Sequence, residues 1–340
     1  MRIAQVSPLF ESVPPACYGG TERVVSWLTE ELVRQGHEVT LFASGDSSTT
    51  AELIPVCPRA LRLNRCQDQM AHHIRMLEMV QRMLERFDVV HYHIDYLHFP
   101  LSRLHGRPQL TTLHGRLDIP DLVPLYQSFR DMPVVSISDS QREPLPMALW
   151  LGTVYHGLPE DLLAPRLDHG SYLAFLGRIS PEKRVDRAIE LALQKGIPIR
   201  IAAKIDDANT GYFEEMVRPL LGQPGVEFVG EIGDDRKSEF LGGALALLFP
   251  IDWPEPFGLV MIESLACGTP VVAFRNGSVP EVLDDGVTGF IVDDMESALD
   301  AVERVRTLDR RHCRAAFEER FSSRRMTRDY LALYEKVAAA

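Results

Sequence analysis

The chain has few cysteines, and no pattern would join them. Its five cysteines are scattered through 340 residues, without a Cys-x-x-Cys pair or a Cys/His spacing typical of zinc sites. We therefore expect a reduced, cytoplasmic protein rather than a disulfide-bonded or zinc-stabilised one. No apolar run reaches the roughly 18 residues that a membrane-spanning helix needs. The N-terminal stretch is also too short in apolar length for a signal peptide, so no stable insertion into a membrane is expected.

Positive charge is scarce as well. Lys and Arg number 36 against 48 Asp and Glu, which gives a net charge of -12. Binding to nucleic acid depends largely on neutralising phosphates, so no nucleic-acid partner is expected. The Gly-x-Gly-x-x-Gly fingerprint is absent too, which disfavours a two-domain dehydrogenase. A bilobal periplasmic receptor would need an export signal, and the sequence shows none.

What the chain does have is a regular alternation of short β-branched runs with helical patterns. This alternation predicts an α/β protein with parallel sheets built from right-handed βαβ units. A loop-like stretch at 158–170 divides it into two doubly wound Rossmann-like domains, 1–158 and 159–318, facing an interdomain cleft. The segment 319–340 is predicted to be a C-terminal helix that packs back on the first domain. The expected strands are Ile3–Ser7, Glu38–Ala43, Val89–His93, Gln109–Leu113, Val134–Ser138, Thr153–Tyr155, Tyr172–Leu176, Ile199–Ala203, Val226–Val229, Ala246–Phe249, Val271–Phe274 and Gly289–Val292.

In such folds ligands bind at the carboxyl ends of the strands, so residues that directly follow strands are the candidates for a site. Gly19 and Gly20 lie between the first strand and the first helix, where glycines allow close approach of a ligand and Thr21 could cap the helix. His114 ends the run Thr-Thr-Leu-His-Gly at another strand end. A plain turn and a structural histidine are the alternative interpretations.

Two cations flank the start of a helix in the second half. Arg178 ends a predicted strand, Ser180 and Pro181 read as a helix cap and first helical residue, and Lys183 lies in the first turn. Both cations could then reach one point above the helix N-terminus, which suits a diphosphate. A solvated surface pair is the alternative.

The most specific pattern is the segment PEPFGLVMIESLACGTPVV at 254–272. Glu255 lies in a proline-rich loop, Gly258 is predicted to begin a helix, and Glu263 lies on that helix. Two carboxylates so placed could accept hydrogen bonds from a polyol. Paired carboxylates also occur in glycosidases, and the sequence does not give their separation in space.

These motifs together resemble the family-4 retaining glycosyltransferases of GT-B fold. The resemblance rests on the Gly19–Gly20 loop, the Thr-x-His-Gly run that ends at Gly115, the Arg178/Lys183 pair and the glutamates Glu255 and Glu263 with the Ala-Cys-Gly-Thr-Pro-Val-Val that follows. It covers nearly the whole chain. The opening IAQVSPLFESVPPACYGGTERVV and the run TLFASGDS are similar to a bacterial subgroup described as UDP-glucose:tetrahydrobiopterin glucosyltransferases.

The resemblance implies a role for each motif. Gly19 and Gly20 would approach the donor diphosphate, and Arg178 and Lys183 would neutralise it as it leaves. Glu263 would accept from the ribose hydroxyls, and His114 would contact the sugar near its reacting centre. The hexose hydroxyls would be held by the side chain of Glu255 and the backbone of Phe257, Gly258 and Leu259. The implied catalytic set is His114, Arg178, Lys183 and Glu255.

The family implies retention by front-side attack, in which the leaving diphosphate takes the acceptor's proton. No metal and no cofactor are expected, and a UDP-sugar serves as co-substrate. The segment HYHIDYLH looks like a metal cluster, but a strand would place His91 and His93 on one face, which favours a structural role or an acceptor site. His93, Asp95 and Tyr18 are the candidates for binding the acceptor.

The sequence thus predicts a hexosyltransferase that moves glucose from UDP-glucose to a hydroxyl of a small soluble acceptor. An acceptor that is lipid-linked or a polysaccharide at a membrane surface is the alternative within the same fold. A nucleotide-sugar-binding protein without transfer activity is the alternative from another class. Acceptor loops vary most on a shared scaffold, so the acceptor and the oligomeric state stay open.

Overall fold

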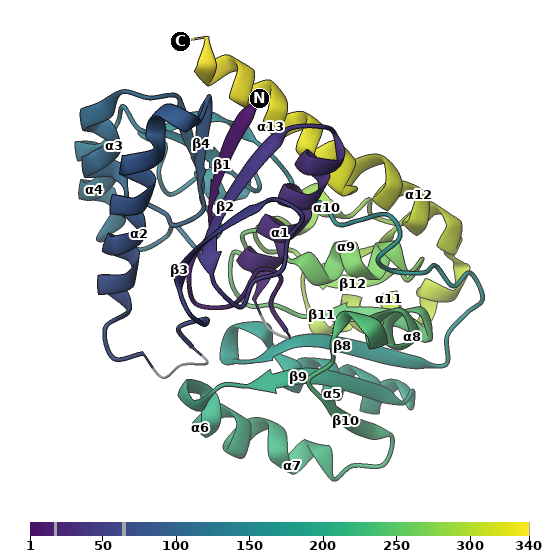
Figure 1. Cartoon of the computed structure of the whole chain (residues 1–340). Coiled ribbons are helices and arrows are strands. Elements are labelled where there is room, and N and C mark those ends of the chain that lie inside the picture. The colour runs from purple at the N-terminus through teal and green to yellow at the C-terminus, as the bar shows by residue number, and fades with distance from the viewer. Residues whose placement is uncertain (17–18, 63–65, 340) are drawn as a thin grey trace. The chain divides into compact units, whose positions relative to one another are not determined.

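The computed structural model describes residues 1–16, 19–62 and 66–339, and its contacts divide the chain into two units. Unit 1 consists of Met1–Leu158 and Ser323–Ala340, and unit 2 consists of Pro159–Ser322. Each unit is built around one parallel sheet with helices on both faces (Figure 1). In the part of the chain that the structure describes, no helix is both long and apolar enough to span a membrane.

The sheet of unit 1 has the strand order β3-β2-β1-β4-β5-β6-β7, and every pair is parallel. Because β1 pairs with both β2 and β4, the strand order reverses beside β1, which is where ligands bind in doubly wound sheets. The strands are β1 (Arg2–Val6), β2 (Glu38–Ser44), β3 (Glu52–Cys57), β4 (Val89–Tyr92), β5 (Gln109–Thr112), β6 (Pro133–Ser136) and β7 (Leu149–Thr153).

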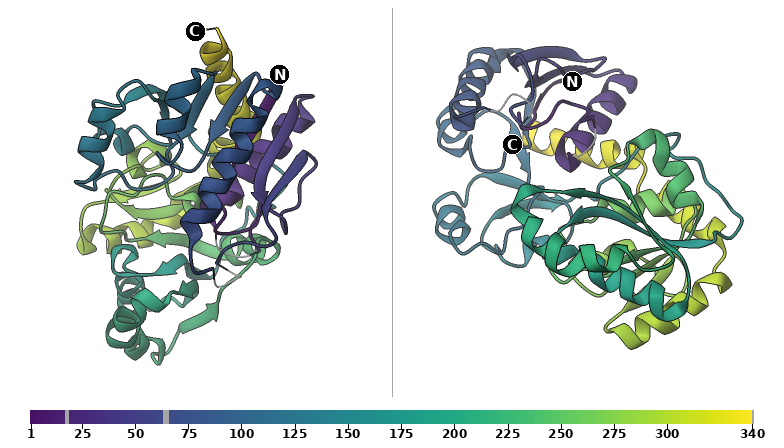
Figure 2. Two further views of the ribbon diagram at one scale, coloured as in Figure 1. Left: turned by 60° about the vertical axis from the view of Figure 1, so that its left-hand side comes forward. Right: turned by 90° about the horizontal axis from the view of Figure 1, so that it is seen from below.

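Helices cover both faces of this sheet. On one face α1 lies against β2, and the C-terminal α13 lies against α1, β4 and β5, as Figures 1 and 2 show. On the other face α2 packs its buried Met76, Leu77 and Val80 onto the strands. The helices of this unit are α1 (Gly20–Arg34), α2 (Gln69–Met83), α3 (Phe99–His105), α4 (Leu122–Ser128) and α13 (Ser323–Ala338), with short 3-10 turns η1 (Leu84–Arg86) and η2 (Ser140–Arg142).

The sheet of unit 2 has the order β10-β9-β8-β11-β12-β13, again parallel throughout. Here the order reverses between β8 and β11. The strands are β8 (Tyr172–Ile179), β9 (Ile199–Ile205), β10 (Val226–Gly230), β11 (Ala244–Phe249), β12 (Val271–Phe274) and β13 (Gly289–Val292).

Helices α5 and α11 cover one face of this sheet, and α8 and α9 cover the other, with α12 against α9. The helices are α5 (Val185–Lys195), α6 (Thr210–Tyr212), α7 (Arg218–Leu221), α8 (Asp234–Gly242), α9 (Leu259–Ala266), α10 (Val279–Val282), α11 (Met295–Arg304) and α12 (Arg310–Arg320). Shorter turns are η3 (Pro181–Lys183), η4 (Asp207–Asn209), η5 (Phe213–Val217) and η6 (Val305–Thr307).

The prediction of two parallel-sheet, Rossmann-like α/β units is confirmed, but four local features differ from the predictions. Strand β3 is not among the predicted strands. The strand expected at Thr153–Tyr155 ends at Thr153, and it begins with the apolar residues Leu149–Leu151, which the prediction did not include. The helix expected from Thr21 begins at Gly20, so Thr21 is not its cap. The C-terminal helical stretch is broken at 321–322 between α12 and α13.

Candidate functional site

The fully buried strand β11 leads into the loop that carries Glu255. Gly258 ends this loop as the N-cap of α9, with φ of 78° in the left-handed region. The positive φ favours glycine, and a Cβ at this position would also lie 2.9 Å from Cε of Met261 and 3.1 Å from Cζ of Phe249, so these two side chains would have to shift. Helix α9 therefore begins at Leu259, one residue after the predicted start, and its first N–H groups lie directly behind the loop.

Glu255 forms an ion pair with Lys183, and both side chains are largely buried, at 11% and 14% exposure. The indole Nε1 of Trp253 donates to the same carboxylate oxygen, Oε2, at 2.8 Å. The Lys183 ammonium also lies 5.3 Å from the ring centroid of Trp253 and 5.5 Å from that of Phe249. Two of the predicted site residues are thus brought together, and their charges neutralise each other. No described residue donates to Oε1 of Glu255.

A second loop, Asn276–Gly277–Ser278, supports the Glu255 loop and was missed by sequence reasoning. Asn276 donates from Nδ2 to the carbonyl of Ile251 at 2.9 Å, and Ser278 donates from its backbone N–H to the carbonyl of Glu255 at 3.0 Å. A Cβ on Gly277 would lie 2.3 Å from the Glu255 carbonyl oxygen, so only glycine permits this approach. The Asn-Gly pair after a strand was the available signal.

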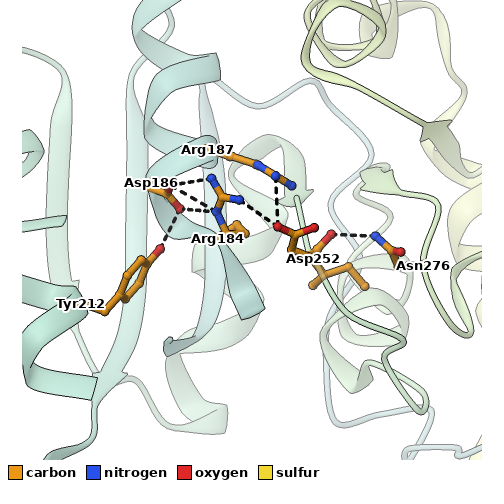
Figure 3. Close-up of polar contacts among 7 residues, drawn as sticks. Arg184, Asp186, Arg187, Tyr212, Asp252 and Asn276 are labelled. Carbon is orange, nitrogen blue, oxygen red and sulfur yellow. Dashed lines mark hydrogen bonds and ion pairs between the residues drawn. The ribbon is translucent and has the colours of Figure 1, made fainter. Parts of the chain in front are cut away.

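A network of ion pairs fixes the other side of the same loop (Figure 3). Asp252 accepts from Arg184 at 2.9 Å and from Arg187 at 3.1 Å. Arg184 also binds Asp186, and Tyr212 donates to that carboxylate at 2.7 Å. Partial burial disfavours the charged form of Asp186, but the hydrogen bonds from Arg184 and Tyr212 outweigh it and hold its pKa below the usual range. The Glu255 loop is therefore tied to the start of α5.

Arg178 ends β8 near the predicted place, but its partners differ from those of Lys183. It lies 3.4 Å from Glu182 and 3.8 Å from Asp206. Lys204 contacts Asp206 as well, at 3.1 Å. The structure therefore places the two cations on separate carboxylates. Ser180, predicted to cap a helix, precedes the 3-10 turn η3 without a side-chain capping bond.

Glu263 lies on α9 and is only 3% exposed, and its lysine partner is not the one that Glu255 has. Its Oε1 accepts from Lys237 of α8 at 2.6 Å, and Lys237 also contacts Asp234 at 3.0 Å. Lys237 was not singled out from the sequence, because it stands in the charged run DDRKSE, which reads as a solvated face. No described residue donates to Oε2 of Glu263.

In unit 1, Gly19 is the N-cap of α1 and Gly20 its first residue. No side chain caps this helix start, and the carbonyl of Gly19 accepts from the N–H of Arg23 at 3.1 Å. The first N–H groups of α1 thus lie at the end of the first strand's loop, as a contact to an anion would require. Tyr18, predicted to bind the acceptor, lies outside the described residues.

His93 and His114 are brought together at the ends of β4 and β5. Nδ1 of His93 and Nε2 of His114 are 2.8 Å apart, and the His114 ring stacks on that of His156 with centroids 5.3 Å apart. Burial lowers the pKa of His114 to about 3 and that of His93 well below its usual range, so both are neutral near pH 7. The buried Nδ1 of His114 has no hydrogen-bond partner among the described residues.

Asp95 follows β4 with φ of 51°, an uncommon conformation for a residue other than glycine. The surrounding protein raises its pKa to about 6, because desolvation disfavours the carboxylate. The structure shows no contact between Asp95 and either His93 or His114 among its hydrogen bonds and ion pairs for the described ranges. Backbone strain and a raised pKa together are typical of functional positions.

The other histidines of the segment HYHIDYLH are hydrogen-bonded inside the fold. His91 contacts Tyr334 and Thr112, and His98 contacts Ser102 and Thr111. Across residues 1–16, 19–62 and 66–339, no three His, Cys, Asp or Glu side chains are grouped so that they could hold a metal ion.

Two sequence families match this chain, one in each unit. Residues 18–139 match the model of glycosyltransferase family 4, and residues 166–320 match that of glycosyl transferases group 1. The D-inositol 3-phosphate glycosyltransferase of Saccharomonospora viridis is 34% identical over 54% of this chain and 45% of its own length. An uncharacterized glycosyltransferase of Methanocaldococcus jannaschii is 25% identical over 86% of this chain and 85% of its own. The match thus spans less than half the length of the first of these relatives.

Solved structures show the same fold at lower identity. Sucrose-phosphate synthase of Thermosynechococcus elongatus has a TM-score of 0.81 at 18% identity and covers 100% of this chain and 99% of its own. AviGT4, a glycosyltransferase involved in avilamycin A biosynthesis, has a TM-score of 0.76 at 23% identity, with 100% and 98% covered. HepE of Anabaena, in complex with UDP and glucose, has a TM-score of 0.75 at 16% identity, with 99% and 100% covered. Residues 18–139 and 166–320 are thus similar to glycosyltransferase family 4 and to glycosyl transferases group 1, respectively, and the chain has the GT-B fold of its structural neighbours.

Proposed function

We propose that the protein is a retaining glycosyltransferase that moves a hexose, with glucose from UDP-glucose as the first candidate, to a hydroxyl of a small soluble acceptor in the cytoplasm. The observation that carries this proposal is the pair of largely buried carboxylates in unit 2. Glu255 and Glu263 are each held by a lysine through one oxygen, which leaves the other oxygen of each to accept from hydroxyl groups. Two such acceptors suit a ligand with two sets of hydroxyls, a ribose and a hexose.

The neighbours support the donor class. HepE is described in complexes with UDP, with UDP and glucose, and with UDP-glucose. The catalytic domain of starch synthase IV from Arabidopsis thaliana is described with ADP and acarbose. A nucleoside diphosphate is therefore common to both, and we propose UDP as the nucleotide for this chain.

In the proposed reaction, the bond between the sugar C1 and the diphosphate oxygen breaks as the acceptor oxygen bonds to C1 on the same face. The acceptor's proton passes to an oxygen of the leaving diphosphate, so no side-chain nucleophile is needed. Arg178 and Lys183 would stabilise the charge that develops on the diphosphate, together with the N–H groups of Gly19, Gly20 and the start of α9. The reaction needs no cofactor in this scheme.

The side chains around the sugar and the acceptor complete the proposal. Glu255, with the backbone of Phe257, Gly258 and Leu259, would hold the hexose hydroxyls, and His114 would contact the sugar near its reacting centre. His93 and Asp95 would contact the acceptor. A carboxyl group with a pKa near 6 accepts a hydroxyl hydrogen bond well only above that pH, so acceptor use should improve between pH 5 and 7.

The curated relatives favour one acceptor class to test first. Several are described as D-inositol 3-phosphate glycosyltransferases, so inositol phosphates belong beside free polyols and pterins in an acceptor panel. Lipid-linked acceptors in vesicles and oligosaccharides test the alternative of the same fold.

The deciding experiment incubates the protein with UDP-glucose, ADP-glucose or GDP-mannose and each acceptor, and detects products by mass spectrometry. A glycosylated product with retained anomeric configuration supports the proposal. Tight binding of UDP-glucose without any product would instead support a nucleotide-sugar-binding protein. Glu255→Gln serves as the control that links a product to this site.

A further inference from the structure

A continuous set of hydrogen bonds connects the C-terminal helix α13 to His114 within unit 1. Nε2 of Gln5, on β1, donates to the hydroxyl of Tyr334 at 3.0 Å. Oε1 of the same amide is 2.8 Å from Nε2 of His93, whose Nδ1 is 2.8 Å from Nε2 of His114. The Tyr334 hydroxyl also lies 2.8 Å from Nδ1 of His91. All of these groups except His114 are almost completely buried.

The chemistry of these groups determines which atom of each hydrogen bond carries the hydrogen. A neutral imidazole has one N–H donor and one acceptor nitrogen. Because the Gln5 oxygen can only accept, Nε2 of His93 carries the hydrogen and Nδ1 of His93 is an acceptor. Nε2 of His114 must then carry a hydrogen to donate to it. Nδ1 of His114 is left as an acceptor, and it is the buried nitrogen without a partner among the described residues.

The assignment of donors and acceptors depends on the orientation of the Gln5 side-chain amide. Its NH2 group faces Tyr334, whose hydroxyl can accept from it and donate to His91 Nδ1 at the same time. If the amide turned by half a rotation, its NH2 would donate to His93. His93 and His114 would then both change tautomer, and Nδ1 of His114 would become a donor. The Tyr334 hydroxyl would then donate to the amide oxygen and accept from Nδ1 of His91, so Tyr334 couples the orientation of the amide, and with it both tautomers, to His91.

We propose that Tyr334 and Gln5 are positioning residues that fix the tautomer of His114, so that its Nδ1 accepts a hydrogen bond from a hydroxyl of the bound sugar. The sugar as ligand rests on the proposed function. The selection of the tautomer does not, because it acts in the protein without ligand. A fixed tautomer removes the cost of rearranging the set when the sugar binds.

The chain offers a matched control on the same helix. Tyr330 lies one turn before Tyr334, is equally buried, and also packs on the His91 ring, with centroids 4.9 Å apart against 5.6 Å for Tyr334. Its hydroxyl contacts Thr112 at 2.8 Å, so it reaches the Gln5 amide only through Thr112, His91 and Tyr334. Tyr330→Phe and Tyr334→Phe therefore remove the same atom from similar surroundings, but only the second removes the partner of the Gln5 amide.

The test is the histidine side-chain 15N chemical shifts of the ligand-free protein, which report the tautomer directly. We expect Nε2–H for His93 and His114 in the wild type and in Tyr330→Phe, and a mixture of tautomers in Tyr334→Phe and in Gln5→Met. With a working transfer assay, kcat should fall roughly 5- to 10-fold in Tyr334→Phe, about the value of one hydrogen bond. The affinity for UDP, whose proposed contacts do not include His114, should stay within about 2-fold.

Unchanged tautomers in both Tyr334→Phe and Gln5→Met would overturn the proposal, as would an equal change in Tyr330→Phe. Gln5→Met keeps the test available if Tyr334→Phe does not fold. If the tautomers respond as expected but no donor is turned over by the wild type, the positioning role stands and the proposed function fails. If transfer occurs but the tautomers do not respond, the positioning role fails alone.

Discussion

Lys183 and Glu255 form an ion pair in the ligand-free protein, so neither charge of the proposed donor site is free of a partner before a donor binds. From the sequence, Lys183 was assigned to a phosphate and Glu255 to a sugar. The ammonium has three N–H groups, so it can keep Glu255 while donating to a phosphate oxygen. Breaking one partner of a largely buried pair leaves the other charge unpaired, which costs more than the pair itself contributes. The pair should therefore stay formed when a donor phosphate binds to Lys183.

Removal of the lysine tests this account. Lys183→Ala should weaken UDP binding by about 1.5–3 kcal/mol, the value of a charge-assisted hydrogen bond. Arg178→Ala should lower transfer by a similar factor, through loss of the leaving-group charge partner. Isothermal calorimetry with UDP and initial rates at subsaturating donor are the measurements. Lys195→Ala, which breaks the pair with Glu303 on the outside of α5, is the control. Wild-type turnover in both Lys183→Ala and Arg178→Ala would rule out the assignment.

The two glutamates should separate nucleotide from sugar recognition. Glu263→Gln places an amide where hydroxyl donors must be accepted, so it should weaken binding of UDP and of UDP-glucose alike. Lys237 keeps Asp234 as a partner in this variant, so the fold should tolerate it. Glu255→Gln should leave UDP affinity nearly intact and lower kcat, since the proposed contacts of Glu255 lie on the sugar, the group that changes charge. Calorimetric titration of both variants with UDP decides between them. Equal losses would contradict the assignment, and a loss in Glu255→Gln alone would reverse it.

Single candidate residues could be predicted from the sequence more readily than their partners. Glu263 could be named from its motif, but Lys237 lies in a run of charges that has no distinctive pattern. Its importance comes from α8 and α9 lying side by side, a contact between segments 26 residues apart. The same holds for His93 and His114, which are neighbours only because β4 pairs with β5.

Among the elements, the loop after β12 carries the clearest steric requirement. Gly277→Ala should displace the Glu255 backbone, because the new Cβ would lie 2.3 Å from its carbonyl oxygen. We expect at least roughly a 10-fold loss of UDP-glucose turnover and a lower melting temperature. Gly286→Ala is the matched control, since Gly286 also has a positive φ, of 75° against 55°, but nothing lies within 4 Å of its Cβ position. If the two variants behave alike, backbone strain rather than the close approach explains the loss.

Element prediction succeeded where apolar runs were long and failed where a local rule gave the wrong answer. Strand β3 contains Pro55 and lies at the edge of the sheet, beside β2. Proline makes a strand less favourable in the sequence pattern, but an edge position tolerates it. Thr21 satisfied the preference for a helix cap, yet Gly19 is the N-cap, with φ of 146°. The start of α1 lacks a side-chain cap, which leaves its N–H groups available for the proposed contact to a diphosphate, whereas sequence preferences favour a capping side chain.

For the molecule as a whole, we expect transfer without a metal ion. The proposed neutralising groups for the diphosphate are Arg178, Lys183 and the helix N-termini, which belong to the chain itself. The assay is transfer after exhaustive dialysis against EDTA, with activity expected to stay within about 2-fold of the untreated protein. Activity that is lost on dialysis and restored by Mg²⁺ or Mn²⁺ would show that these groups are insufficient.

The two units should also differ in their sensitivity to acid. Unit 1 contains nine of the 11 histidines, since only His169 and His312 lie in unit 2, and both of those are exposed. Burial lowers the pKa of His91, His93, His98 and His156 well below the usual range, and that of His114 to about 3. A depressed histidine pKa means that the unfolded state binds more protons than the native state below about pH 6.5. The stabilisation is therefore complete above that pH and is lost as the pH falls.

Each such histidine contributes up to about 1.4 kcal/mol per pH unit to this loss, whereas Asp95, with its pKa raised to about 6, opposes it as a single group. Hydrogen exchange at pH 7.5 and 5.0, with labelling times scaled to the intrinsic rates, measures the outcome. Protection in β1, β4 and β5 should fall far more than protection in β8, β11 and β12. His98→Gln removes one of these buried histidines, so it should lower by about one the number of protons that unit 1 takes up on unfolding at low pH. A loss of protection that is equal in the two sheets, or larger in unit 2, would mean that the buried histidines do not control the acid stability of the protein.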